Sequence, residues 1–215
     1  MREILCFGDS NTYGLIPGTK ERYASNIRWT GILADRLYQD GIRVVEEGLC
    51  GRTTVFEDEL RDNRRGCDLL PVILESHNPV DLVILMLGTY DCKTYYHASA
   101  EVIGLGIEKL LGQIRRANEN TKVLLISPIL LGDEVWKSEF DPEFGRESVE
   151  TSKGLKAVYH AIAKMNGVDF LAASDYAEAS LVDREHLNEE GHKKLAEAVL
   201  TKVKEIYSEK DKKSY

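Results

Sequence analysis

The sequence predicts an α/β protein: a three-layer, doubly wound sheet of about five parallel strands with helices on both faces. Two observations lead to this prediction. Short apolar runs rich in leucine, isoleucine and valine recur along the chain, and longer segments with helical periodicity separate them. The runs are almost continuously hydrophobic rather than alternating, which is typical of parallel strands covered on both faces.

The apolar runs and the helical segments alternate through most of the 215-residue chain. The expected strands are residues 4–7, 44–47, 82–87, 123–126 and 168–171. The expected helices are residues 28–39, 68–76, 101–118, 148–166 and 189 to about 208. Asn188 stands directly before the last helix, where its side chain suits the N-cap position. Right-handed crossovers would join these elements into one sheet.

We expect a single domain over residues 1–207 and a polar, lysine-rich tail over residues 208–215 that frays. One long segment, residues 132–145, interrupts the alternation and carries Trp136, Phe140 and Phe144 among acidic residues. These aromatic side chains either line a pocket or pack locally against the body of the protein. They are also a candidate contact surface for a homo-oligomer.

The charge balance and the cysteines narrow the functional class. With 28 Lys and Arg against 36 Asp and Glu, the formal net charge is −8, which argues against a nucleic-acid partner. No signal peptide is visible, and no apolar run is long enough to span a bilayer. The four cysteines show no CxxC spacing, so we expect a reduced, cytoplasmic protein with no membrane partner. Metal-ligand spacing is also missing, and we expect no metal and no cofactor.

Ser10 stands just past the first expected strand, where residues 4–7 run into Gly8, Asp9, Ser10 and Asn11. In open α/β sheets, ligands bind at the carboxyl ends of the strands. A serine at that edge can act as a nucleophile if a base and an oxyanion site converge on it.

His186 is the strongest candidate for that base among the five histidines. It lies in the loop between the fifth expected strand and the last helix, and this loop opens on the same edge as Ser10. Asp183, three residues earlier, can accept a hydrogen bond from the imidazole Nδ1, which leaves Nε2 free to take the serine proton. An Asp-x-x-His pair alone also fits a loop salt link or a helix cap. Surface or packing roles suit the histidines at 77, 97, 160 and 192.

Two glycine-containing stretches, residues 46–54 and 86–93, follow the second and third expected strands on that edge. Gly51 allows a main-chain N–H to approach a ligand closely, and such donors stabilise an oxyanion. Each stretch also fits an ordinary turn between a strand and a helix, where glycine is common.

Four sequence blocks resemble those of the SGNH, or GDSL-type, hydrolases. They are residues 8–10 (GDS), Gly51, residues 88–91 (GTYD) and Asp183-x-x-His186, in the family's order. Longer strings such as ILCFGDSNTYG and EEGLCGRTT look like the bacterial arylesterase/acyltransferase branch, which acts on short-chain esters. The resemblance implies a flavodoxin-like fold, with Ser10 as nucleophile, His186 as base and Asp183 as its orienting residue. It also implies that the main-chain N–H groups of Ser10 and Gly51 hold the oxyanion.

Tyr90 stands where that family has an asparagine whose amide is the third oxyanion donor. Three outcomes are open: the phenol donates from a shifted backbone, the ring swings out and leaves two donors, or the ring blocks the site. Losing one such donor costs on the order of 10²–10³ in kcat. Asn11 carries an amide that either compensates in part or serves the turn. Asn11, Tyr13, Trp29 and Tyr95 are also candidate lining residues of a substrate pocket, and the alternative for the three aromatic side chains is packing in the core or an interface.

The sequence thus predicts a serine esterase that hydrolyses small short-chain esters, or transfers their acyl group, through an acyl-enzyme. Within the same class, the alternative substrates are a carbohydrate ester, a lysophospholipid or a thioester. A competing interpretation is a catalytically weakened binding protein on this fold, because Tyr90 replaces the asparagine. A nucleotide-binding module fits the fold alone, but the Gly-x-Gly-x-x-Gly turn and the Walker lysine are absent.

Overall fold

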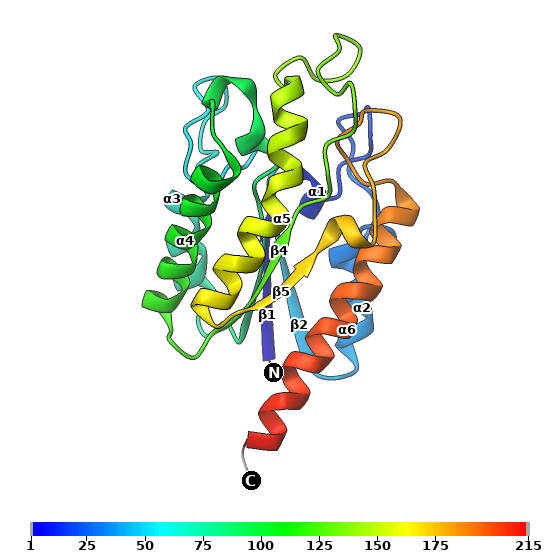
Figure 1. The fold of residues 1–215 in the computed structure, drawn as a ribbon. Helices are drawn as coiled ribbons and strands as arrows, with labels where there is room; N and C mark the ends of the chain where they lie inside the picture. The colour runs from blue at the N-terminus through cyan, green and yellow to red at the C-terminus, as the bar shows by residue number, and fades with distance from the viewer. Residues whose placement is uncertain (1, 214–215) are drawn as a thin grey trace.

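The computed structural model describes residues 2–213, which fold around one sheet of five parallel strands (Figure 1). The strand order is β2-β1-β3-β4-β5, and every neighbouring pair is parallel. Their bounds are β1 (Arg2–Gly8), β2 (Ile42–Gly48), β3 (Leu82–Met86), β4 (Lys122–Ser127) and β5 (Asp169–Ala172). The predicted fold class is therefore confirmed.

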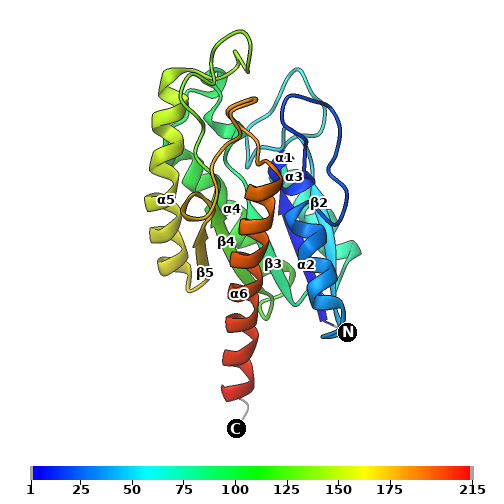
Figure 2. The same cartoon turned by 90° about the vertical axis from the view of Figure 1, so that its right-hand side faces the viewer.

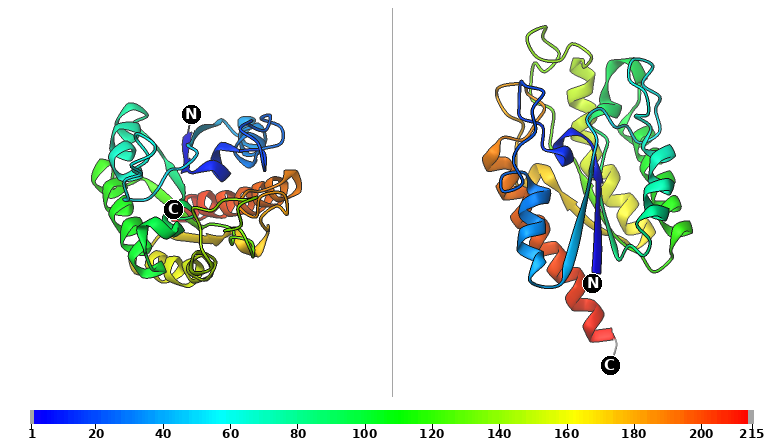
Figure 3. Two further views of the ribbon diagram at one scale, coloured as in Figure 1. Left: turned by 90° about the horizontal axis from the view of Figure 1, so that it is seen from above. Right: turned by 180° about the vertical axis from the view of Figure 1, so that it is seen from behind.

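Helices cover both faces of this sheet (Figure 3). On one face lie α2 (Trp29–Tyr38) and α6 (Glu189–Lys213), which run side by side (Figure 2). On the other face lie α3 (Gly66–Ser76), α4 (Ala100–Ala117) and α5 (Arg146–Asn166). The remaining helical segments are single turns: α1 (Ser10–Tyr13), η1 (Tyr90–Cys92), η2 (Thr94–Tyr96) and η3 (Ala173–Asp175).

The pleat of β1 explains why the core has two halves. Leu5 and Phe7 point into the cluster packed by α3, α4 and α5, whereas Ile4 and Cys6 point into the cluster packed by α2 and α6. All four side chains are fully buried. Successive side chains of a strand face opposite sides, so a strand covered by helices on both sides must be apolar at every position. This rigid sheet presents its carboxyl edge, where the loops that follow β1, β2, β3 and β5 gather.

The predicted strands and long helices all occur, with ends displaced by only a few residues. The exception is α6, which continues to Lys213 instead of ending near Ser208; the last two residues of the tail expected to fray lie outside the described residues. The last turns of this helix are polar, and polarity alone does not stop a helix because Lys and Glu have high helix propensity. No helix among residues 2–213 is long and apolar enough to cross a membrane.

The segment of residues 132–145 contains turns but no regular helix or strand, as expected. Phe144 is buried in the core cluster next to α4 and α5, and Trp136 packs against that cluster. The Arg184 guanidinium lies 5.5 Å from the Phe140 ring centroid. The aromatic side chains therefore pack against the body of the protein, which favours the interpretation of local packing over that of a pocket lining.

Candidate active site

The backbone after β1 holds Ser10 at the carboxyl edge of the sheet. Asp9 caps the one-turn helix α1, and its Oδ1 accepts a hydrogen bond from Asn11 N at 3.0 Å. Gly8 is required before this turn, because a Cβ there would lie 2.0 Å from Thr12 Oγ1 and 2.7 Å from Met86 O. The turn is thus tightly packed, and the Ser10 side chain within it is fully buried.

His186 and Asp183 reach Ser10 from the loop before α6. His186 Nε2 lies 2.8 Å from Ser10 Oγ, and His186 Nδ1 lies 2.9 Å from Asp183 Oδ2. Asp183 is itself fixed, because its Oδ1 accepts hydrogen bonds from the main-chain N–H groups of Glu185 and His186 at 3.1 and 3.0 Å. Gly18 N donates to Asp183 Oδ2 at 3.0 Å. The contacts expected from the sequence are therefore present, and the side chains of His186 and Asp183 are only 6% and 14% exposed.

Asn11 and Trp29 support this arrangement from beneath and do not line a pocket. Asn11 Oδ1 accepts a hydrogen bond from Leu187 N at 2.9 Å, and Asn11 Nδ2 donates to Glu185 O at 3.3 Å. Trp29 Nε1 donates to Asn11 O at 3.0 Å, and the Trp29 side chain is fully buried. The assignment of both residues to a substrate pocket is wrong, because their polar atoms form hydrogen bonds to buried main-chain groups. Tyr13 is half-buried, with the Arg22 guanidinium 4.6 Å from its ring centroid.

Carboxylates set the charge balance around the imidazole. Burial alone would lower the pKa of His186, but the carboxylates of Glu185, Asp183 and Asp9 outweigh burial and raise that pKa. Burial would raise the pKa of Asp183, yet its hydrogen bond to His186 and the charge of that residue lower it. Asp183 is thus ionised at neutral pH, where it favours the imidazolium form of its partner.

Gly51 lies in the turn after β2 and adopts φ +83°, a left-handed conformation that favours glycine. Among the described residues, neither Ser10 N nor Gly51 N donates a hydrogen bond. Asp91 holds the Gly51 turn against η1, because its carboxylate accepts from Thr54 N at 2.9 and 3.1 Å and also from Thr54 Oγ1. Asp91 belongs to the GTYD block of the sequence, but its contact with the loop after β2 is not visible in the sequence.

Tyr90 begins η1 and is held rigidly. It is 6% exposed, its ring meets the Phe144 ring edge-on at 6.4 Å, and Lys93 Nζ lies 4.3 Å from its ring centroid. These contacts exclude the outcome in which the ring swings out. Burial, followed by the charge of Glu185, raises the pKa of Tyr90, so the phenol keeps its proton and remains a hydrogen-bond donor.

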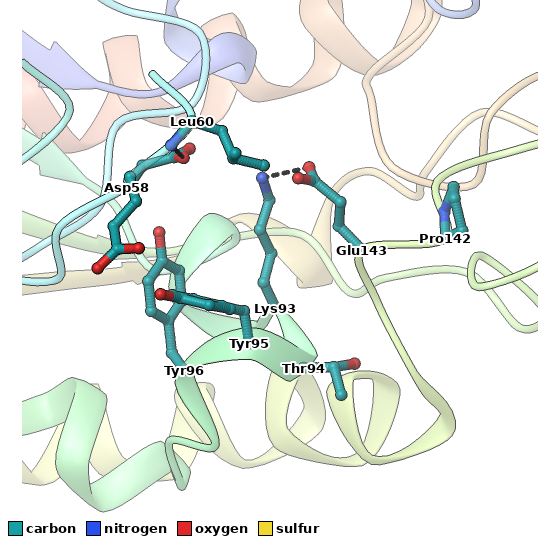
Figure 4. A pocket seen from close by; sticks show the side chains of 9 residues that line it. Asp58, Leu60, Lys93, Thr94, Tyr95, Tyr96, Pro142 and Glu143 are labelled. Carbon is teal, nitrogen blue, oxygen red and sulfur yellow. Dashed lines mark hydrogen bonds and ion pairs between the residues drawn. The ribbon is translucent and has the colours of Figure 1, made fainter. Parts of the chain in front are cut away.

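A cavity of about 340 Å³ is lined in part by Lys93 (Figure 4), whose Nζ lies 4.3 Å from the Tyr90 ring centroid. Tyr95 lines it and is 64% exposed, and Figure 4 shows Lys93 directed toward Glu143, whose Oε2 lies 2.5 Å from Lys93 Nζ. Ser10, Asp183 and His186 are not among its lining residues. The cavity therefore adjoins the candidate site at Tyr90 without containing the serine.

Glu185 is a further site residue that the sequence interpretation missed. Its side chain is 4% exposed, and its Oε1 lies 3.7 Å from His186 Nε2 with no hydrogen-bond partner. The available signal was an acidic residue directly before the candidate base, in a loop that must pack closely on the sheet edge.

Among the described residues, no group of three or more His, Cys, Asp or Glu side chains could hold a metal ion.

Comparison with known proteins gives a consistent assignment. The model of the GDSL-like lipase/acylhydrolase family matches residues 6–194. The native aryl esterase of M. smegmatis is 34% identical, with a TM-score of 0.88 over 95% of this chain and 99% of that one. A carbohydrate acetylesterase from Sinorhizobium meliloti is 38% identical, with a TM-score of 0.87 over 96% of this chain and 100% of that one. Comparison with curated sequences gives no match. The chain thus belongs to the GDSL-like lipase/acylhydrolase family, within its arylesterase branch.

Proposed function

We propose that this protein is a serine esterase in which Ser10, His186 and Asp183 form the catalytic triad. The observation that carries the proposal is the 2.8 Å contact between His186 Nε2 and Ser10 Oγ. The other ring nitrogen, His186 Nδ1, lies 2.9 Å from Asp183 Oδ2. This geometry suits proton transfer from a serine hydroxyl to an imidazole whose tautomer is fixed by a carboxylate.

The reaction proceeds in two halves. Ser10 Oγ attacks the ester carbonyl carbon while His186 Nε2 takes the hydroxyl proton, and a tetrahedral oxyanion forms. His186 then donates that proton to the leaving alcohol, and the acyl group remains on Ser10. Water or a second alcohol resolves this acyl-enzyme by the same steps in reverse. Asp183 stabilises the imidazolium at each stage without accepting its proton.

The main-chain N–H groups of Ser10 and Gly51 hold the oxyanion in this proposal. Both donors lack another partner among the described residues, and the contact between Asp91 and Thr54 fixes the turn that carries Gly51. Tyr90 supplies the third donor through its phenol, which stays protonated. Donors held in place before the reaction cost no reorganisation when charge develops, and this is why they accelerate acyl transfer.

The substrates that fit best are small short-chain esters. Relatives with 34% and 38% identity are an aryl esterase and a carbohydrate acetylesterase, so acetyl esters of phenols or sugars are the first to examine. We also propose a reducing, cytoplasmic setting, since all four cysteines are free.

Covalent labelling tests the nucleophile. A fluorophosphonate forms a stable bond to an activated serine, so the protein should gain the mass of one probe on the peptide that contains Ser10. Ser10→Ala should remain unlabelled, and His186→Gln should react much more slowly because the hydroxyl loses its base. Labelling of Ser10→Ala at the rate of the parent would refute the assignment.

A further inference from the structure

Glu185 is a buried acid that the proposed reaction does not use. Its side chain is 4% exposed, and its Oε1 makes no hydrogen bond. This oxygen lies 3.7 Å from His186 Nε2, the same nitrogen that faces Ser10 Oγ at 2.8 Å. A carboxyl oxygen without a hydrogen-bond partner therefore lies close to the imidazole nitrogen that accepts and donates the proton in the proposed reaction.

The side chain of Glu185 does not hold the loop together, because the main chain does so. Glu185 N donates to Asp183 Oδ1 at 3.1 Å, and Glu185 O accepts from Asn11 Nδ2 at 3.3 Å. Both contacts would survive replacement of the side chain. Its Oε1 has an ion-pair contact with His186 but no hydrogen-bond partner, and a leucine or methionine would avoid the cost of burying such an oxygen. An acid at this position therefore suits a ligand that donates a hydrogen bond.

The neighbours of Glu185 show what that ligand must be. Burial raises the pKa of the Glu185 carboxyl to about 7, the charge of His186 lowers it, and the charges of the acids Asp141, Asp183 and Asp9 raise it. His186 is the base of the proposed reaction, so the free oxygen is left to accept hydrogen bonds from a molecule that shares His186 Nε2.

We propose that Glu185 positions the water that resolves the acyl-enzyme, and thereby favours hydrolysis over transfer of the acyl group to an alcohol. The inference rests on the proposed function, because it requires an acyl group on Ser10. Water has two hydrogens and can donate one to His186 Nε2 and the other to Glu185 Oε1. An alcohol has a single hydroxyl hydrogen, so it can satisfy His186 or Glu185 but not both.

The step balances without transfer of a proton to Glu185. The water oxygen forms a bond to the acyl carbon, and the first water proton passes to His186 Nε2. That proton then goes to Ser10 Oγ as the bond between the acyl carbon and Oγ breaks. The second water hydrogen stays on the oxygen throughout, hydrogen-bonded to Glu185 Oε1, and leaves with the carboxylic acid product.

A partition experiment tests this role. The parent and its Glu185→Leu, Glu185→Gln and Glu178→Leu variants react with p-nitrophenyl acetate in the presence of benzyl alcohol, and the ratio of benzyl acetate to acetate is measured. Glu185→Leu should raise this ratio about tenfold, which is the effect of one net hydrogen bond. Glu185→Gln keeps an acceptor oxygen and should give an intermediate ratio. Glu178 is exposed on the same loop and serves as the matched control, with an unchanged ratio expected.

The ratio separates this inference from the proposed function. Release of p-nitrophenol reports acylation and should be abolished by Ser10→Ala, and release that persists in that variant would refute the proposed function itself. Release that depends on Ser10, with an equal ratio in the parent, Glu185→Leu and Glu185→Gln, would overturn the role of Glu185 alone. If Glu185→Leu does not fold, the near-isosteric Glu185→Met replaces it and is interpreted in the same way.

Discussion

Asn11 Oδ1 accepts a hydrogen bond from the main-chain N–H of Leu187 at 2.9 Å, across 176 residues of sequence. This bond and the one from Asn11 Nδ2 to Glu185 O join the turn that carries the serine to the loop that carries His186. The distance between Ser10 and His186 is therefore set by a buried amide and not by the loop alone.

We expect Asn11→Ala to lower kcat by about ten- to a hundredfold, because the loop that carries the base loses its anchor and the reacting groups drift apart. The free energy of unfolding should fall by about 1–3 kcal/mol, since Leu187 N is left buried without a partner. Steady-state kinetics and urea unfolding measure the two effects. Asn26→Ala, on an exposed side chain, is the control. A wild-type kcat in Asn11→Ala would refute the anchoring role.

The pH profile should report the carboxylates around His186. Only neutral imidazole can accept the serine proton, and the nearby acids raise its pKa above the ordinary value of 6.5. The value of kcat/KM should therefore still be rising with pH well above 6.5. Glu185→Gln removes one negative charge, so it should move the rising limb to lower pH. A limb at the same pH in both proteins would contradict this account of the electrostatics.

Tyr90→Phe tests whether the phenol is a working donor. The variant keeps the ring contacts with Phe144 and Lys93 and loses the hydroxyl with its hydrogen bond to Arg61, so the free energy of unfolding should fall by only about 1 kcal/mol. Loss of an oxyanion donor lowers kcat by about 10²–10³ with a smaller effect on KM. Tyr90→Asn restores the family residue and gives the second comparison. An unchanged kcat in Tyr90→Phe, with a faster Tyr90→Asn, would show that the ring obstructs the site.

Asp91→Ala should loosen the turn that presents Gly51. The variant leaves Thr54 N and Oγ1 buried without their acceptor, at a cost of about 1–3 kcal/mol in the free energy of unfolding. Thermal unfolding and kcat should decline together, because the same contact supports both the fold and the Gly51 N–H. A variant with reduced stability but full kcat would mean that the turn keeps its place without Asp91.

The sequence allowed the sheet, the long helices and the central residues of the candidate site to be predicted for definite reasons. Strands such as residues 82–87 are apolar at every position because helices cover both faces, and parallel strands bring Ser10 and His186 to one edge. The single turns α1 and η1 were not predicted, since a turn of three or four residues has no helical period.

The roles of Asn11, Trp29, Asp91 and Glu185 could not be predicted for a different reason. Each depends on a partner in another loop or on burial, and a local pattern carries no information about either. Polar residues near a serine suggest a pocket, but Asn11, Trp29 and Asp91 all hold main-chain groups at the sheet edge instead. The extent of α6 shows a related limit, because a polar segment can remain helical when nothing in its sequence stops it.

Hydrolysis of p-nitrophenyl acetate by the parent and by Ser10→Ala tests the central claim most directly. The parent should show a burst of p-nitrophenol equal to the enzyme concentration when deacylation is slow. Ser10→Ala should keep an unchanged circular dichroism spectrum and lose about 10⁴-fold or more in kcat. Hydrolysis by Ser10→Ala at a rate comparable to that of the parent would contradict the assignment of Ser10 as the nucleophile.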